Sequence, residues 1–138
     1  MSPRHTISFD HEFHYREIPG LGVRPALLVG IIGPKGQQDT LAIIDSGADY
    51  SLFNGVRAGP IGIGPGDGKR TRLSGLSGGL DVRLLRVTLE ILGSKFDCEV
   101  AFSEQHIARE LLGRNELFDR IRLGLCGGSS LGYFHPRA

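Results

Sequence analysis

The hydrophobic and polar positions of this chain repeat with the short period of β-strands. In residues 95–102, K-F-D-C-E-V-A-F, an apolar side chain stands at every second position, which predicts a strand with one buried face. Residues 25–32 and 39–44 are nearly continuous apolar runs, as expected for strands that are buried on both faces. Residues 82–92, V-R-L-L-R-V-T-L-E-I-L, predict a further, long strand. The pattern therefore predicts a mostly β chain.

The remaining segments give shorter signals. Residues 115–122, N-E-L-F-D-R-I-R, carry apolar residues at helical spacing after Asn115, a favoured N-cap residue, and so predict one short C-terminal helix. Residues 5–18 alternate loosely, which predicts an N-terminal strand or a hairpin. We also expect short strands at 50–53 and 70–73, a helical turn at 104–110 and a short apolar segment at 111–113.

The composition limits the classes of function. A length of 138 residues suits one domain, and the 21 glycines cluster in loops that separate short strands. The net charge of +1 and the absence of Trp argue against a nucleic-acid partner. Cys98 and Cys126 have no CxxC spacing, so a reducing, cytoplasmic location is expected. No stretch has the length or apolar character of a membrane helix or signal peptide, although the chain could be a fragment of a longer, anchored protein.

Residues 43–49, I-I-D-S-G-A-D, are the first candidate for chemistry. The apolar run ends in Asp45, and an aspartate at such a place is by itself most often only a turn former. A carboxylate that leaves a buried sheet lies in partly apolar surroundings, where its proton affinity can be tuned. The Ser46 hydroxyl can lock the turn, and Gly47 lets a ligand backbone come close.

Two later segments favour a catalytic role for Asp45. Residues 111–115, L-L-G-R-N, end a second apolar segment at a glycine, and Arg114 can form an ion pair with Asp49. Residues 74–79, S-G-L-S-G-G, lie between two expected strands. A glycine-rich hairpin tip of this kind can close over a ligand.

In this order, the three segments resemble the retropepsin-like aspartic proteases, the family of the retroviral proteases. That family's signature is an apolar run with D-[ST]-G-A-D, a glycine-rich flap, and an apolar pair followed by G-R-[ND]. Here the three parts stand at 43–49, 73–79 and 111–115, and the resemblance spans roughly residues 25–125. It implies a closed β-barrel with one short C-terminal helix, in a single domain of residues 1–138 whose two ends extend beyond the core.

The resemblance implies roles for the residues of the Asp45 turn. Asp45 is similar to the catalytic aspartate of the family. Ser46 is similar to the residue whose hydroxyl ties two active-site turns together across a dimer, and Gly47 to the residue whose carbonyl meets the substrate backbone. Many members of the family have Thr in place of this serine, whose hydroxyl is kept here without the packing methyl group.

The resemblance also implies a set of substrate-binding residues. Ala48 and Asp49 match positions that bind the substrate main chain, and Arg114 resembles the residue that supports Asp49. The flap tip, which would cover the substrate, falls on Gly75, Leu76 and Ser77. Retroviral members often carry more glycine in the flap.

One chain does not carry both carboxylates that this chemistry needs. One carboxylate takes a proton from water while a second, protonated one gives a proton to the peptide carbonyl. In the aspartic proteases these two acids share one proton, because neighbouring carboxylates cannot both ionise. The chain has one D-[ST]-G motif, so a two-fold dimer would place Asp45 beside its own copy. We therefore expect a homodimeric endopeptidase that acts on polypeptides, with no metal and no cofactor.

Other interpretations stay open. The same fold could serve as a peptide-binding or dimerisation module without useful turnover, or with very specific cleavage. The motifs could also coincide in an unrelated β-barrel. For His5, His11 and His14, solvated or packed side chains are a simpler interpretation than a metal site. The loop at 59–68 fails the phosphate-binding P-loop pattern, and a surface loop is the simpler interpretation.

Overall fold

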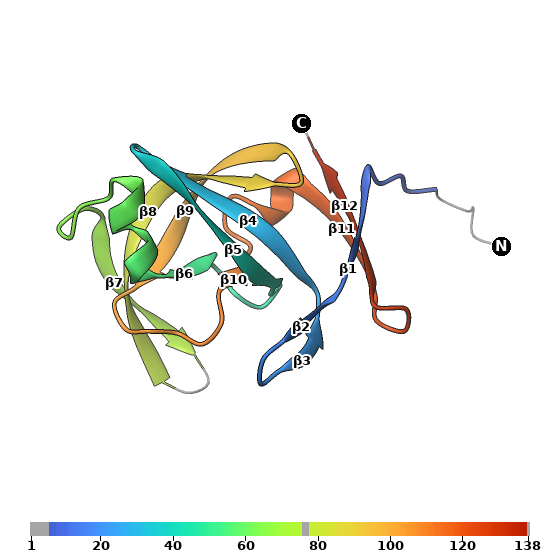
Figure 1. Cartoon of the computed structure of the whole chain (residues 1–138), viewed down its shortest axis with the longest axis horizontal. Helices are drawn as coiled ribbons and strands as arrows, with labels where there is room; N and C mark the ends of the chain where they lie inside the picture. The colour runs from blue at the N-terminus through green and yellow to red at the C-terminus, as the bar shows by residue number, and fades with distance from the viewer. Residues whose placement is uncertain (1–5, 76–77, 138) are drawn as a thin grey trace.

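The computed structural model describes residues 6–75 and 78–137, and the chain is mostly β, as its pattern predicts (Figure 1). Seven strands form the largest sheet: β4 (Ala26–Gly33), β5 (Gly36–Ile44), β6 (Leu52–Asn54), β7 (Lys69–Gly75), β8 (Gly78–Ile91), β9 (Ser94–Ser103) and β10 (Leu111–Leu112). Their order is β4-β5-β10-β6-β9-β8-β7. Because β4 also pairs with β8, six of the seven strands close into a ring of pairings, and β7 extends it as a hairpin arm.

The two ends of the chain build a second sheet. Its strands are β1 (His11–His14), β11 (Ile121–Cys126) and β12 (Leu131–Pro136), and a small hairpin of β2 (Arg16–Ile18) and β3 (Gly22–Arg24) follows β1. β12 lies in the middle of this sheet, antiparallel to both neighbours. In Figure 1 the sheet stands on the right, beside the larger one. The completely buried Phe134 belongs to the common core, so the second sheet packs against the first.

The core fills the space inside the ring, where the inward positions of the long strands meet. In β9 the alternation places Phe96, Cys98 and Val100 in the core, each at most 5% exposed. The antiparallel register sets Val87 of β8 opposite Cys98, and Leu89 opposite Phe96. Complete burial of one such aliphatic or aromatic side chain stabilises the fold by about 1.5–3 kcal/mol. The period of the sequence thus determines which face of each strand is buried.

The short C-terminal helix expected at 115–122 is confirmed only as a single 3-10 turn, η3 (Phe118–Arg120). Ile121, whose spacing fitted the helix, instead begins β11. Leu117 and Ile121 are both buried, so apolar residues at this spacing serve core packing without a longer helix. The segment 104–110, expected as a helical turn, has no helical structure.

Two further 3-10 turns, which the sequence pattern did not predict, lie just before the glycine- and proline-rich loop and at its start. They are η1 (Gly55–Arg57) and η2 (Gly59–Ile61). Ile61 is completely buried and anchors the loop in the core. None of the helical segments in 6–75 and 78–137 has the length and apolar character needed to cross a membrane.

Candidate active site around Asp45

Asp45 lies directly after β5, where the chain leaves the sheet in a tight turn. Its backbone N–H donates to the carbonyl oxygen of Leu112 at 3.0 Å, and its own carbonyl accepts the N–H of Ala48 at 3.1 Å. The carboxylate oxygen Oδ1 accepts the backbone N–H of Gly47 at 2.9 Å. Asp45 is half-buried, whereas Gly47 is exposed. These three bonds give the carboxylate a defined position at the end of the strand.

The alternation of β5 shows which way this side chain faces. Ala42 and Ile44 are buried in the core, while Leu41 and Ile43 are half-buried on the other face. Successive residues of a strand point to opposite faces, so Asp45 continues the row of Leu41 and Ile43. The carboxylate is therefore directed away from the core and toward the outer face of β5.

β10 links the two motifs that the sequence places far apart. This two-residue strand lies between β5 and β6, parallel to β5 and antiparallel to β6. Leu112 stands opposite Ile44, and Leu111 stands opposite Leu52. The L-L-G-R-N segment therefore meets the D-S-G-A-D segment at the point where β5 ends.

Gly113 packs directly against the backbone that follows the Asp45 turn. A Cβ atom at this position would lie 2.3 Å from the carbonyl carbon and oxygen of Tyr50, so no larger residue fits without a backbone shift. The N–H of Gly113 donates to Oγ of the buried Ser51 at 3.0 Å. Sequence reasoning did not single out Ser51, although its place in D-Y-S directly after the motif is a signal that could have found it.

Asp49 and Arg114 form the ion pair that their motifs led us to expect. Nη2 of Arg114 donates to Oδ1 of Asp49. The backbones are joined as well, since the N–H of Arg114 donates to Ala48 at 2.9 Å and that of Asn115 donates to Asp49 at 2.7 Å. The two side chains are 75% and 56% exposed, so the ion pair itself adds little stability. Its place beside the turn leaves the Asp49 carboxylate accessible to a ligand.

The β7–β8 hairpin corresponds to the expected flap. All of β7 pairs with the first half of β8, from Lys69 opposite Leu84 to Gly75 opposite Gly78. Leu76 and Ser77, two of the three residues expected at the flap tip, lie outside the described residues.

Two hollows lie near the end of β5, one beside Leu41 and Ile43 and the other beside Ile44 and Ser46. The first hollow has a volume of about 170 Å³ and is lined by Ile18, Leu41, Ile43, Asn54 and residues 106–110. The second hollow has a volume of about 250 Å³ and is lined by Ile44, Ser46, Phe118, Ile121, Leu123 and Leu125. The first is lined by Leu41 and Ile43, whose row Asp45 continues, and the second includes the exposed Ser46.

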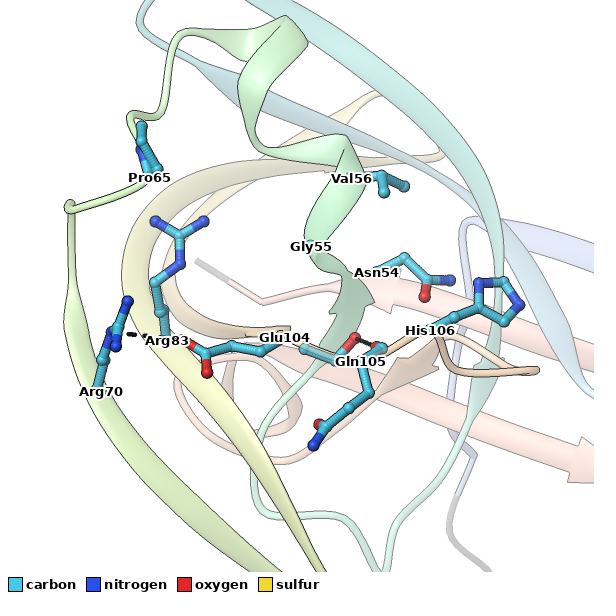
Figure 2. Close-up of a pocket in the computed structure, with 10 residues that line it drawn as sticks. Asn54, Gly55, Val56, Pro65, Arg70, Arg83, Glu104, Gln105 and His106 are labelled. Atoms are coloured by element: carbon cyan, nitrogen blue, oxygen red, sulfur yellow. Dashed lines mark hydrogen bonds and ion pairs between the residues drawn. The ribbon is translucent and has the colours of Figure 1, made fainter.

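A third hollow, larger than these two at about 440 Å³, does not include the Asp45 turn (Figure 2). Figure 2 shows Arg70, Arg83 and Glu104 on one side of it and Asn54 farther across. Arg83 donates to the carbonyl oxygens of Gly64 and Asp67, at 2.7 and 3.1 Å. Arg70 pairs with Glu104 at 3.4 Å. These cations already hold loop and strand together, so size alone does not make this hollow the better candidate for chemistry.

A buried carboxylate that sequence reasoning missed lies close to β10. Glu110 is 7% exposed and accepts four hydrogen bonds, one from Thr40, one from the Asn54 backbone and two from Arg57. Burial alone would raise its pKa, but the bonds from Arg57, Thr40 and Asn54 outweigh burial and hold the pKa below its usual value. Glu110 directly precedes the L-L-G segment, yet its partners lie far away along the chain, so no local pattern reveals them.

Within the described part of the chain, no three His, Cys, Asp or Glu side chains are grouped so that they could hold a metal ion. Comparison with protein-family models found no match, and comparison with curated proteins found no similar sequence.

Proposed function

We propose that this chain is an aspartic endopeptidase of the retropepsin-like type, active as a homodimer in which two Asp45 carboxylates share one site. In this proposal the chain folds as a closed β-barrel of the retropepsin-like type. The observation that supports it best is the hydrogen bond from Asp45 to Leu112, which joins the D-S-G-A-D and L-L-G-R-N segments at one place.

The proposed reaction uses the two carboxyl groups as an acid and a base. The ionised Asp45 of one protomer takes a proton from a water molecule, and the water oxygen attacks the peptide carbonyl carbon. The protonated Asp45 of the partner subunit gives its proton to the carbonyl oxygen, which yields a neutral tetrahedral diol. The first Asp45 then gives the proton it took from water to the amide nitrogen, while the Asp45 of the partner subunit takes a hydroxyl proton from the diol; the C–N bond breaks, and an acid and an amine leave the site. No covalent intermediate and no cofactor take part.

The substrate of this proposal is an extended polypeptide that adds backbone hydrogen bonds beside the turn. Gly47, Ala48 and Asp49 would contact its main chain, and the β7–β8 hairpin would cover it as a flap with its tip at Gly75, Leu76 and Ser77. The 170 Å³ hollow beside Ile43 offers space for one substrate side chain on the Asp45 face. Its half-buried Ile18, Leu41 and Ile43 would contact an apolar group there, beside the polar residues of the same lining.

Two features near Ser46 support a dimer built around the turn. The 250 Å³ hollow beside Ser46 is lined mainly by apolar side chains, and Leu125 at its rim is 52% exposed. β11 pairs only with β12 among the described residues, which leaves the backbone groups of its outer edge available to a second copy. A second copy on this side would bring its own Ser46 and Asp45 toward the first. The free thiols of Cys98 and Cys126 suit the reducing cytoplasm as its location.

A cleavage screen with a peptide library, run from acidic to neutral pH, tests the proposal. The wild-type protein should cleave some members, and a transition-state analogue of aspartic proteases should inhibit this cleavage. Asp45→Asn should abolish cleavage without loss of folding, whereas Asp119→Asn, an exposed acid on η3, should retain it. Peptide binding without cleavage by the wild type would instead favour a non-catalytic peptide-binding module. Cleavage by Asp45→Asn would overturn the assignment of Asp45.

A further inference from the structure

The segment of residues 104–110 contributes its last five residues, 106–110, to one wall of the hollow beside Ile43. It connects β9 to β10 without regular structure, and most of its residues are exposed. Ile43 and Leu41 of β5 form the opposite wall. An irregular exposed segment has many conformations available, so the shape of this hollow depends on what fixes the wall.

Hydrogen bonds from Asn54 and Ile43 hold this segment in place. In its middle, the N–H of Ile107 donates to the Asn54 side chain at 2.8 Å, and the same side chain donates back to the Ile107 carbonyl at 3.2 Å. At its end, the carbonyl of Glu110 accepts the N–H of Ile43 at 2.9 Å. The wall therefore meets β5 two residues before Asp45.

The Glu110 carboxylate joins the end of this segment to β5, β6 and η1 by side-chain hydrogen bonds. Oε1 accepts Thr40 Oγ1 of β5 at 2.6 Å and Nη2 of Arg57 at 2.7 Å. Oε2 accepts the Asn54 N–H of β6 at 3.0 Å and Nε of Arg57 at 2.6 Å. A two-pronged contact between guanidinium and carboxylate fixes orientation as well as distance. Asn54 bonds Glu110 through its backbone N–H and Ile107 through its side chain. The hydrogen bonds of Glu110 and those of Ile107 therefore hold the same segment.

We propose that Glu110 is a positioning residue for substrate binding: with Arg57, it fixes the 104–110 wall against β5 and so sets the shape of the hollow that receives a substrate side chain beside Asp45. This inference rests on the proposed peptidase function. Glu110 itself touches no reacting group. Its loss should weaken the binding of substrate and transition state alike, which raises KM and leaves kcat nearly unchanged.

The test compares Glu110→Gln with Glu116→Gln, each measured on the library peptide that the wild type cleaves best. Glu116 also forms a two-pronged pair, with Arg86, but it lies outside this wall. Glu110→Gln should raise KM about tenfold, since a lost charged hydrogen bond is worth about one factor of ten or more in an equilibrium. Hydrogen–deuterium exchange of the 104–110 backbone should become faster in the same variant. Glu116→Gln should change neither quantity.

The outcomes separate this inference from the proposed function. Absence of any cleavage by the wild type contradicts the peptidase proposal, whereas a cleaving wild type with unchanged KM in folded Glu110→Gln overturns the role of Glu110. A loss of kcat at unchanged KM overturns it as well, because the network would then position the catalytic turn. If Glu110→Gln does not fold, Thr40→Val removes one of its bonds with little change of shape. A smaller rise in KM is then expected, and an unchanged KM overturns the inference.

Discussion

The backbone N–H of Asp45 donates to the carbonyl oxygen of Leu112, so the candidate catalytic residue is bound to a segment that the chain reaches only after four further strands of the main sheet. The bond involves main-chain atoms alone and does not depend on either side chain. Replacement of the Asp45 carboxylate by an amide of the same shape therefore leaves this connection intact. A loss of activity in Asp45→Asn can then be attributed to chemistry.

Gly113→Ala should destabilise the protein strongly. The added Cβ would overlap the Tyr50 carbonyl group, and backbone atoms there cannot move aside as a side chain does. Overpacking of this kind costs about 1–3 kcal/mol or more, which urea unfolding measures directly. Gly127→Ala is the matched control, because an added Cβ there meets no atom within 4 Å. Equal stability of the two variants would contradict the packing described for β10.

Asp49→Asn should affect activity more than stability. Its ion pair with Arg114 is largely exposed, and exposed pairs contribute about 0–1 kcal/mol. If the Asp49 carboxylate binds the substrate main chain, the variant should show a raised KM with a nearly unchanged unfolding free energy. Glu90→Gln, which removes a distant, half-buried acid near Lys95, serves as the control for a change of charge. A large loss of stability without a change in KM would assign Asp49 a purely structural role.

Glu110 should make part of the stability dependent on pH. Its pKa in the folded protein lies below the usual value of 4.5, so the folded state favours the ionised form. The resulting stabilisation is present above that usual value and is lost as the pH falls through the lower folded pKa. Glu110→Gln should thus be less stable than the wild type at neutral pH, and the difference should shrink in acid. Urea unfolding at several pH values measures this difference, and a constant difference would argue against a buried, ionised Glu110.

The two cysteines should differ sharply in reactivity. Burial raises the pKa of Cys98 to about 12, whereas hydrogen bonding from Ser129 lowers the pKa of the exposed Cys126. The thiolate is the reactive form, so a thiol reagent should modify Cys126 rapidly and Cys98 only after unfolding. Mass spectrometry after brief labelling would show one modified site in the wild type and none in Cys126→Ser. Rapid labelling of Cys98 would contradict its place in the core.

Local patterns predicted the elements whose side chains obey a simple period. The clean alternation of 95–102 and the apolar runs at 25–32 and 39–44 correspond to β9, β4 and β5. For residues 25–32 the expectation of burial on both faces was too broad, because Leu28 of β4 is 60% exposed. Periodicity identifies a strand more readily than it shows how much of the strand is covered.

The C-terminal hairpin shows what a local pattern cannot reveal. Residues 121–126 and 131–136 form β11 and β12, but glycines interrupt both, and Ile121 also fitted the spacing of a helix. Their pairing with β1 joins the two ends of the chain, which depends on the whole fold.

The candidate site was predictable to a similar extent. The ion pair of Asp49 with Arg114 followed from two motifs with a known spatial relation. The buried network around Glu110 did not, because Thr40, Asn54 and Arg57 come together only after β5, β6 and η1 have assembled. Charged residues with distant partners carry no periodic signal.

A mixing experiment tests the shared Asp45 site most directly. A fixed amount of wild-type protein is allowed to exchange subunits with increasing amounts of Asp45→Asn, and peptide cleavage is measured. If each site needs two Asp45 carboxylates, activity should fall to about one half at equal amounts, because a random half of the wild-type chains then pair with the variant. Activity that stays constant, whatever the excess of Asp45→Asn, would contradict a site shared between two copies.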